Sequence, residues 1–533
     1  MSVMAYMPRG ADGIIIRVES DIRRGIPGVD ISGLAEGAVR EARERVRAAF
    51  RNSGFDFPPD RILINLAPAG LKKDGAALDL PIALSVMAAA GLVRIEGDLL
   101  VMGELELSGR IRPVRGVLAA IAAGLADGIK EFIVPAENAG EAAILAEKGA
   151  MFTAAENLQS AVHAILLKDE TGSLPQSIYD KSCINHIDEK NNGDYHSDFA
   201  DVRGQEIYKR ALEIAAAGGH NVLAFGPPGA GKTMLARRMP SIMARLTTNE
   251  AVEVTRLHSL AGSGGIIDKL ITNPPFRAPH HSASKEGILG GGKISRPGEI
   301  SMAHFGILYL DEAPEFKINV LQALREPLED KVISIVRADG LLHLPAEFQL
   351  ILTANSCRCG RLGMRDTDGM CLCSPDEINK HWRKLGGALL DRIEIRTAVI
   401  PPKISEINKH PVNNHPTEEK NAVKADSSAE IARRVKSAVE IQRDRFKGTS
   451  VRRNALIPAG KVSVFCSMNE KAQNAFNTAV SKLGLSGRAY HGILKTARTI
   501  ADLEGKSVIE TEHILEAVQH RRLGDDPWDI MSV

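Results

Sequence analysis

The sequence is poor in aromatic residues, which make up 4% of its 533 residues and include two Trp. Scarce aromatics argue against a large base-stacking surface and favour backbone contacts if the partner is a nucleic acid. Neither sign of charge is in clear excess, because the formal net charge is +1. Any basic surface must therefore be local.

Long apolar runs are also missing, and none approaches the roughly 20 residues that span a bilayer. The opening stretch, MSVMAYMPRGADG, lacks the basic-then-apolar plan of a signal peptide. The six cysteines are not spaced like a disulfide scaffold, since four of them fall within residues 357–373. We therefore expect a protein of the reducing cytoplasm that has no membrane partner.

The chain is too long for one core, and a prior of about 150 residues per domain suggests three or four units. Short β-like runs alternate with alanine-rich helical patterns in two regions, which predicts an α/β fold class. Two polar stretches separate these regions from each other and from a helical C-terminal segment. The predicted boundaries are 1–168 (α/β), 169–200 (acidic linker), 201–400 (α/β), 401–428 (polar linker) and 429–533 (helical).

A glycine-rich loop, GPPGAGKT, follows the apolar strand NVLAF and precedes a helical pattern. The glycines let backbone N–H groups surround phosphates at a helix N-terminus. The lysine can neutralise the β- and γ-phosphates of ATP, and the threonine can bind Mg²⁺. The predicted ATP-binding residues are Gly226, Pro227, Pro228, Gly229, Ala230, Gly231, Lys232 and Thr233.

Two later strands end in polar residues. GILYLDEAPEF predicts a strand that ends at Asp311 and Glu312, where the first acid can hold the metal and the second can orient water. FQLILTAN predicts a strand that ends at Asn355, which is placed to help position that water. Downstream, ALLDRIEI contains Arg392 and LSGRAYHGILKTART contains Arg488 at the start of a helix. An arginine from a neighbouring subunit can stabilise charge on a γ-phosphate.

This order of motifs resembles the AAA+ ATPases. The stretches FRAPHHSASKEGILGGGKISRPGEISMAHFGILYLDEAPEF, LREPLED and LLDRIEI are similar to the magnesium-chelatase-like branch. Together with the N-terminal region, the resemblance points to the ComM/YifB family of competence-associated proteins. It implies a hexameric ring with ATP between subunits, and a DNA helicase that drives branch migration during natural transformation. It also implies cis roles for Lys232, Thr233, Asp311, Glu312 and Asn355, and places Arg392 as the trans finger and Arg488 as the lid sensor.

The sequence departs from this family pattern at two places. The family usually has Asn-Pro after the sensor strand and Ser-Gly-Pro before Leu-Leu-Asp-Arg, whereas this chain reads TANS and LGGALLDR. The departures concern the local geometry around Asn355 and Arg392 rather than the identity of either residue.

The N-terminal stretch LAPAGLKKDGAALDLPIAL is similar to the loop that carries the nucleophile of Lon protease. Alignment on Lys-Asp-Gly puts Ala77 at the serine position. The segment GELELSGRIRPVRGVLAAI resembles the one that carries Lon's lysine base, and that position falls on Leu118. Because nucleophilic catalysis needs both groups, we expect residues 1–168 to be a catalytically inactive Lon-like domain. Such a domain is then a brace for oligomers or a guide for substrate.

Four cysteines form the pattern C-x-C, eleven residues, C-x-C. Four thiolates can complete a tetrahedral structural zinc site and clamp a polar loop. Reduced, unliganded cysteines and a redox pair are the alternatives. A catalytic metal is disfavoured because four thiolates leave no open position. The predicted ligands are Cys357, Cys359, Cys371 and Cys373.

Three segments are candidates for contact with DNA. Arg40, Arg43, Arg47 and Arg51 follow one helix face beside an apolar stripe, an arrangement that suits a phosphate backbone or an ordinary solvated surface. The glycine-rich HHSASKEGILGGGKISRPGE and the predicted β-hairpin KVISIVRADGLLHLP resemble inserts that face the pore in related AAA+ proteins. Either segment can equally be a solvated loop.

Three functions remain for comparison. The leading prediction is a ring ATPase that acts on single-stranded or branched DNA, with ATP, Mg²⁺ and structural Zn²⁺ as its cofactors. The alternative is a magnesium-chelatase-type motor that drives metal insertion into a porphyrin. ATP-dependent proteolysis is a third possibility, which Ala77 and Leu118 argue against.

Overall fold

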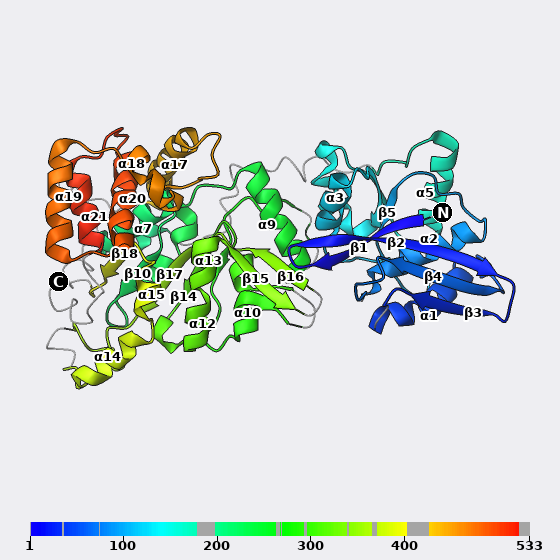
Figure 1. The fold of residues 1–533 in the computed structure, drawn as a ribbon, viewed down its shortest axis with the longest axis horizontal. Helices are drawn as coiled ribbons and strands as arrows, with labels where there is room; N and C mark the ends of the chain where they lie inside the picture. The colour runs from blue at the N-terminus through cyan, green and yellow to red at the C-terminus, as the bar shows by residue number, and fades with distance from the viewer. Residues whose placement is uncertain are drawn as a thin grey trace, which may run out of the picture.

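The computed structural model describes residues 2–34, 37–73, 75–177, 198–262, 267, 269–292, 296–337, 340–364, 370–401 and 426–521. We refer to residues 2–177, 198–401 and 426–521 as the N-terminal, central and C-terminal units. The N-terminal unit lies at one end of the long axis, and the C-terminal unit covers the central unit at the other end (Figure 1). The middle parts of both predicted linkers fall outside the described residues. Helix α5 (Leu158–Thr171) extends into the first predicted linker, and α17 (Ser428–Arg445) begins at the end of the second.

The described part of the N-terminal unit is built on a seven-stranded mixed sheet with the order β3-β4-β2-β1-β5-β8-β9. Strand β4 alternates exposed and buried residues, so Ile62, Ile64 and Leu66 all face the core. Its strands are β1 (Ser2–Arg9), β2 (Asp12–Arg23), β3 (Gly28–Ser32), β4 (Arg61–Ala67), β5 (Leu99–Val101), β8 (Glu131–Pro135) and β9 (Met151–Ala155). The remaining elements are α1 (Gly37–Asn52), η1 (Ala76–Leu78), α2 (Asp79–Ala89), β6 (Glu104–Leu105), β7 (Ile111–Arg112), α3 (Val117–Ala126), η2 (Ala136–Asn138), α4 (Ala139–Ala143) and η3 (Ala146–Lys148).

The central unit contains a parallel five-stranded sheet with the order β11-β14-β17-β10-β18. Strands β10, β14, β17 and β18 are buried along their whole length, as expected for a parallel sheet covered on both faces. The strands are β10 (Val222–Phe225), β11 (Phe276–Arg277), β14 (Ile307–Leu310), β17 (Gln349–Ala354) and β18 (Ile395–Ala398). Because the strands are parallel, the residues that follow them gather at one edge of the sheet and the residues that precede them gather at the other.

Helices and two small hairpins surround this central sheet. The hairpins are β12 (Gly290–Gly291) with β13 (Arg296–Pro297), and β15 (Val332–Arg337) with β16 (Gly340–Pro345). The β15–β16 pair confirms the hairpin that the sequence predicts for KVISIVRADGLLHLP. The helices are η4 (Phe199–Asp201), α7 (Glu206–Gly218), α8 (Lys232–Ala236), η5 (Met239–Ile242), α9 (Thr248–Ala261), α10 (Lys285–Leu289), α11 (Glu299–Met302), η6 (Ala313–Glu315), α12 (Ile318–Ala323), α13 (Arg325–Asp330), α14 (Pro375–Arg383) and α15 (Gly387–Leu390).

The C-terminal unit is helical and packs on α7 of the central unit. Ile214 of α7, Val435 of α17 and Ile493 of α20 share one hydrophobic core. Inside this unit the buried Asp502 pairs with Arg445 at 2.5 Å. Its elements are α17, η8 (Asn454–Leu456), η9 (Ala459–Lys461), α18 (Val462–Phe465), α19 (Glu470–Leu483), α20 (Gly487–Leu503) and α21 (Thr511–Arg521). The mixed α/β fold with a helical C-terminus is confirmed.

The N-terminal and central units meet where α3 packs against α9 (Figure 1). Ser259 of α9 accepts a hydrogen bond from the Gly116 N–H at 2.9 Å and donates one to the buried Glu141 carboxylate. Arg256 pairs with Asp12 at 3.1 Å. Gly10 has a φ of 70°, which favours glycine, and a Cβ there would lie 2.2 Å from the Leu342 side chain of the β15–β16 hairpin, so the two units approach closely at this point. Polar and apolar contacts therefore join the two units.

Among the described helices, none combines the length and the apolar character that a membrane crossing requires.

Candidate active site

The glycine-rich loop joins β10 to α8, as the sequence predicts. A Cβ on Gly226 would lie 2.0 Å from the Val399 carbonyl oxygen, so only glycine fits where this loop passes β18. Lys232 at the start of α8 donates hydrogen bonds to the carbonyls of Gly226 and Pro227, at 2.7 and 2.8 Å. Burial lowers the pKa of Lys232 to about 8, against the attraction of Asp311 and Glu312. The loop thus holds a largely buried ammonium group at the end of β10.

Acidic and hydroxyl side chains converge beside this lysine. Thr233 donates to the Asp311 carboxylate at 3.1 Å, and Thr353 of β17 donates to the same carboxylate at 2.5 Å. These neighbouring oxygens are hard donors of the kind that Mg²⁺ prefers. The structure therefore brings together the two residues that the sequence predicts as metal ligands, and adds Thr353, which the sequence analysis missed. Its only signal was a hydroxyl two residues before Asn355, near the end of the run FQLILTAN.

Glu312 adopts a left-handed backbone conformation, with φ 49° and ψ 50°. Such a conformation is uncommon for a non-glycine residue and is found where the surroundings hold it in place. Here the Glu312 N–H donates to Asp311 at 3.1 Å and to Thr353 at 3.2 Å. The turn after β14 therefore presents two successive carboxylates beside the glycine-rich loop.

Asn355 lies at the end of β17, and its side-chain oxygen accepts a hydrogen bond from Lys232 at 3.1 Å. The backbone behind it is held by α14, because His381 contacts the Asn355 carbonyl at 3.2 Å and Trp382 donates to the Ser356 carbonyl at 2.9 Å. Trp382 also packs edge-on against Phe225, the last residue of β10. The departure TANS is thus accommodated by contacts from α14.

Arg392 and Arg488 do not join this group. Arg392 precedes β18, and Asn221, which precedes β10, donates to its carbonyl at 2.9 Å. Both residues therefore lie at the sheet edge opposite to the glycine-rich loop. The Arg392 guanidinium pairs with Glu329 at 2.8 Å, and Arg488 contacts the same carboxylate. Glu329 is a partner that the sequence analysis missed, although it lies in the quoted stretch LREPLED.

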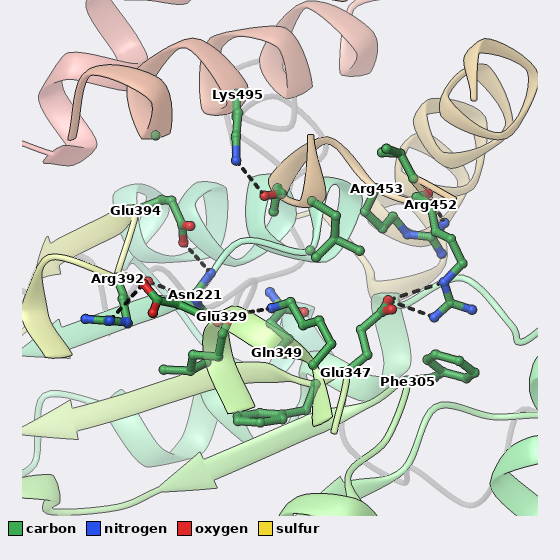
Figure 2. Close-up of a pocket in the computed structure, with 18 of the residues that line it drawn as sticks. Asn221, Phe305, Glu329, Glu347, Gln349, Arg392, Glu394, Arg452, Arg453 and Lys495 are labelled. Carbon is green, nitrogen blue, oxygen red and sulfur yellow. Dashed lines mark hydrogen bonds and ion pairs between the residues drawn. The ribbon is translucent and has the colours of Figure 1, made fainter. Parts of the chain in front are cut away.

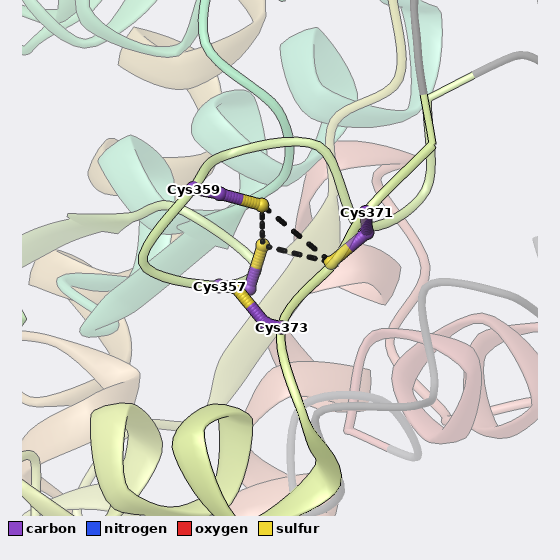
Figure 3. A group of neighbouring side chains, drawn as sticks. All are labelled: Cys357, Cys359, Cys371 and Cys373. Carbon is purple, nitrogen blue, oxygen red and sulfur yellow. Dashed lines mark hydrogen bonds between the residues drawn. The ribbon is translucent and has the colours of Figure 1, made fainter.

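The four clustered cysteines converge around one point (Figure 3), and their sulfur atoms all lie within 4.8 Å of one another. The Sγ atom of Cys357 is 3.3 Å from that of Cys359 and 3.6 Å from that of Cys371. Zn–S bonds of about 2.3 Å in a tetrahedron place sulfur atoms about 3.8 Å apart, so this donor set fits zinc. The loop also lies against the nucleotide loop, since a Cβ on Gly360 would be 2.8 Å from Pro228.

The Lon-like positions hold apolar residues, as the sequence shows. Ala77 lies in η1, and Leu118 is fully buried in α3. The polar groups nearby in sequence have structural partners: Lys73 donates to the Pro68 carbonyl, and Ser85 donates to Ser20 at 2.8 Å. Among the described contacts, none brings Lys73 or Ser85 to Ala77, where a substitute nucleophile or base would have to lie.

The predicted DNA-contacting segments are described in part. Arg43, Arg47 and Arg51 are exposed on α1, while the adjoining stripe formed by Val39, Ala42, Val46, Ala49 and Phe50 is buried. The side chains of Arg40 and Arg337 and the whole of Lys293 lie outside the described residues. Within α1, Arg43 approaches Glu44 at 3.4 Å, and no described acid pairs with Arg47 or Arg51.

Sequence comparisons agree with this geometry. The family "Magnesium chelatase, subunit ChlI" matches residues 198–407, "Subunit ChlI of Mg-chelatase" matches residues 18–138, and the ChlI C-terminal family matches residues 425–521. Competence protein ComM of Haemophilus influenzae is 37% identical over 530 residues, covering 98% of each chain. YifB of Salmonella typhimurium is 38% identical over 531 residues, again with 98% of each chain covered.

The N-terminal region has a second, partial similarity. A Lon protease of Desulfovibrio desulfuricans is 27% identical over 142 residues, which are 25% of this chain and 16% of that protease. The full-length matches and the three ChlI segments therefore confirm the resemblance drawn from the motifs. The chain belongs to the ComM/YifB family of magnesium-chelatase-like AAA+ proteins, with a Lon-like N-terminal region.

Proposed function

We propose that the protein is a DNA-dependent ATPase that works as a ring of identical subunits and promotes branch migration of recombination intermediates during natural transformation. The observation that carries the proposal is the separation of Arg392 from the glycine-rich loop, on opposite edges of one parallel sheet. The family membership supports the ATPase activity, and the name of the Haemophilus influenzae relative, competence protein ComM, supports the cellular role.

The first part of the proposal is ATP hydrolysis at the edge formed by the ends of β10, β14 and β17. Backbone N–H groups of residues 226–233 and the Lys232 ammonium would bind the phosphates. Thr233 and Asp311 would hold Mg²⁺, which supplies positive charge to the β- and γ-phosphate oxygens when bound. Glu312 would orient the attacking water, and Asn355 would fix its position. Thr353 would keep Asp311 and the Glu312 backbone in place.

The second part is a site shared between copies. Arg392 cannot serve the nucleotide of its own chain, because the length of the sheet separates the two. A neighbouring copy that presents this face to the nucleotide loop would complete the site, with Arg392 stabilising charge on the γ-phosphate. Arg488 contacts the same Glu329 carboxylate, so we assign it to the same face of the subunit.

Zinc has a supporting role in the proposal. With zinc bound to Cys357, Cys359, Cys371 and Cys373, the loop between β17 and α14 would be clamped beside Pro228. This loop connects Asn355 to the α14 residues that hold its backbone. The metal would thereby fix the sensor strand relative to the nucleotide loop.

The N-terminal unit is proposed to guide DNA rather than to cut protein. The exposed guanidinium groups of Arg43, Arg47 and Arg51 follow one face of α1, which suits contacts with phosphates. The contacts of Ser259 and Arg256 in α9 with this unit would transmit movements of the central unit to it.

The proposal is tested by ATPase rates measured with single-stranded, duplex and branched DNA, while strand displacement is followed in parallel. We expect stimulation by branched or single-stranded DNA that weakens steeply with salt, because each neutralised phosphate contributes a slope of about 0.7 to 0.9. Absence of DNA binding at low salt, together with a rate that no DNA form changes, would contradict the proposal.

The alternative function is a motor for metal insertion into a porphyrin, favoured by the ChlI description of all three matching families. Under this alternative a porphyrin, and not DNA, would stimulate ATP hydrolysis. The partial similarity of the N-terminal unit to Lon protease disfavours it, although one of the ChlI families matches part of the same unit.

A further inference from the structure

A cavity of about 510 Å³ lies between the central and C-terminal units, at the sheet edge opposite to the nucleotide loop. Its floor includes Asn221, Gln349 and Glu394, which lie at the starts of β10, β17 and β18. Figure 2 shows Lys495 of α20 and Arg453 on the C-terminal side of this cavity, with Lys495 pointing toward the sheet edge. This volume is within the range of pockets that bind small molecules.

Three cations line the cavity without an acidic partner. Lys331 donates to the Leu328 carbonyl at 2.7 Å, Lys495 to the Ala455 carbonyl at 3.0 Å, and Arg453 to the Arg452 carbonyl at 3.1 Å. In the portion of the chain that is described, none of the three forms an ion pair. Each therefore keeps further donor hydrogens for another acceptor.

The acids around the cavity are engaged elsewhere. Glu250 and Glu347 both pair with Arg452, at 2.7 and 2.8 Å. Glu329 pairs with Arg392, and Asp391 approaches Arg521 at 3.5 Å. The remaining acid is Glu394, which accepts a hydrogen bond from the Asn221 N–H at 3.0 Å.

Burial shifts the pKa of each of the three cations and of Glu394 in the direction that favours the neutral form. It lowers the pKa of Lys331, of Lys495 and, to about 10, of Arg453, while the attraction of nearby carboxylates opposes it. Burial raises the pKa of Glu394. Lys331, Lys495 and Arg453 stand against Glu394 alone, because the other acids of the cavity are paired with other arginines. One carboxylate thus faces three cations, and the surplus of positive charge needs an anion.

We infer that this cavity binds the phosphate group of a small phosphorylated molecule, with Lys331, Arg453 and Lys495 as its ligands. A phosphate dianion offers several acceptor oxygens and two negative charges, which match the spare donors and the surplus charge. The binding would join the turn after α13, which carries Lys331, to Arg453 at the start of η8 and to Lys495 of α20. The ligand would thereby fix the C-terminal unit on the central sheet of one chain. Arg392 and Arg488 line the same cavity and are proposed to meet a neighbouring copy's nucleotide, so the inference concerns the chain before it joins a ring.

The test measures thermal stabilisation by inorganic phosphate, and separately by ADP, at constant ionic strength and at protein concentrations too low for ring formation. The Lys232→Ala variant is the background, so that binding at the glycine-rich loop is suppressed. In this background, Lys331→Met and Lys495→Met are compared with Lys461→Met, which replaces an exposed lysine of η9.

We expect phosphate to raise the melting temperature of the background and of the Lys461→Met control equally. The two cavity variants should bind phosphate at least tenfold more weakly. Without phosphate each variant loses one hydrogen bond to a backbone carbonyl but also one of three mutually repelling cations, so its melting temperature should stay close to that of the control. A larger stabilisation by ADP than by phosphate would identify a nucleotide as the fuller ligand. Equal phosphate effects in all variants, or no phosphate effect in any of them, would overturn the inference.

Discussion

The Lon-like loop and the nucleotide loop use lysine in opposite ways. Lys73 of the N-terminal unit is buried and donates to the Pro68 carbonyl, with Ala77 and Leu118 at the positions where the protease has its reactive pair. Lys232 of the central unit is surrounded by Asn355, Thr233 and Asp311. On the predicted alignment, the first site has apolar residues at the two reactive positions, whereas the polar side chains of the second site contact one another. The difference teaches that polar residues in a loop of familiar sequence indicate a catalytic site only when their side chains contact one another.

The largest effect that would sharpen this comparison is expected at Arg392. Arg392→Ala should lower ATP turnover by about 10³- to 10⁵-fold, the range for loss of an arginine finger, while ATP binding is kept. Turnover is measured by phosphate release and binding by a fluorescent nucleotide. Arg383→Ala, which changes an exposed arginine of α14, is the matched control and should leave turnover within about twofold.

Mixing distinguishes a shared site from a structural defect. Arg392→Ala and Lys232→Ala should each be nearly inactive alone, but a mixed ring would contain interfaces with an intact loop on one side and an intact arginine on the other. We expect mixing to restore part of the turnover. Mixtures that stay inactive although they form rings would refute the shared site.

The next effect compares the two lysines directly. Lys232→Ala should lower ATP hydrolysis by about 100- to 1,000-fold, because a preorganised positive charge at the phosphates is lost. Lys73→Met should leave hydrolysis within about twofold and cost about 1 kcal/mol of stability through its lost hydrogen bond. Casein should stay intact with both variants and with the unchanged protein. A large loss of ATPase activity in Lys73→Met would break the comparison.

Much of the nucleotide edge could be predicted from sequence, because each residue follows an apolar strand and parallel strands bring their ends together. The alternation C-x-C likewise predicted the convergence of four sulfur atoms. Thr353 was missed since its side chain is inside a strand, where a hydroxyl usually has no more than a packing role. Its hydrogen bonds to Asp311 and Glu312 became evident only when β14 and β17 were placed side by side.

The joints between units could not be predicted. Ser259 and Glu141 are 118 residues apart in sequence, and no pattern in either segment indicates that one hydroxyl and one carboxylate meet. The same holds for Glu329, which contacts two arginines from different units. Local periodicity fixes which face of an element is apolar, but it does not say which distant element covers that face.

A moderate effect is expected at the cysteine cluster. Cys357→Ser should abolish binding of one zinc ion per chain, lower the melting temperature by several degrees and reduce ATP turnover, because the loop beside Pro228 loses its clamp. Metal content is measured by elemental analysis. Cys466→Ser replaces a buried cysteine of the C-terminal unit outside the cluster and should keep the zinc. Zinc-free protein with all four cysteines intact and full ATPase activity would argue against a structural metal.

The smallest effect concerns pH at the joint between the central and C-terminal units. His220 is buried before β10 and contacts Thr499 of α20 at 2.8 Å, and burial lowers its pKa to about 3. In the unfolded chain His220 binds a proton near pH 6.5, whereas in the folded protein it stays neutral until about pH 3. The contribution of His220 to stability is therefore present above pH 6.5 and is lost as the pH falls toward 3. Between pH 7 and 5.5 this loss is on the order of 1 kcal/mol.

His220→Gln can keep the contact with Thr499 but does not titrate, so it should remove this part of the pH dependence. Denaturant unfolding at pH 7 and 5.5, followed through the C-terminal unit, measures the difference. His163→Gln, in α5 of the N-terminal unit, is the matched control, because its side chain is exposed and should leave the pH dependence unchanged. An unchanged pH dependence in His220→Gln would mean that His220 is protonated in the folded protein, and the joint would then have to accommodate a buried charge without an acidic partner.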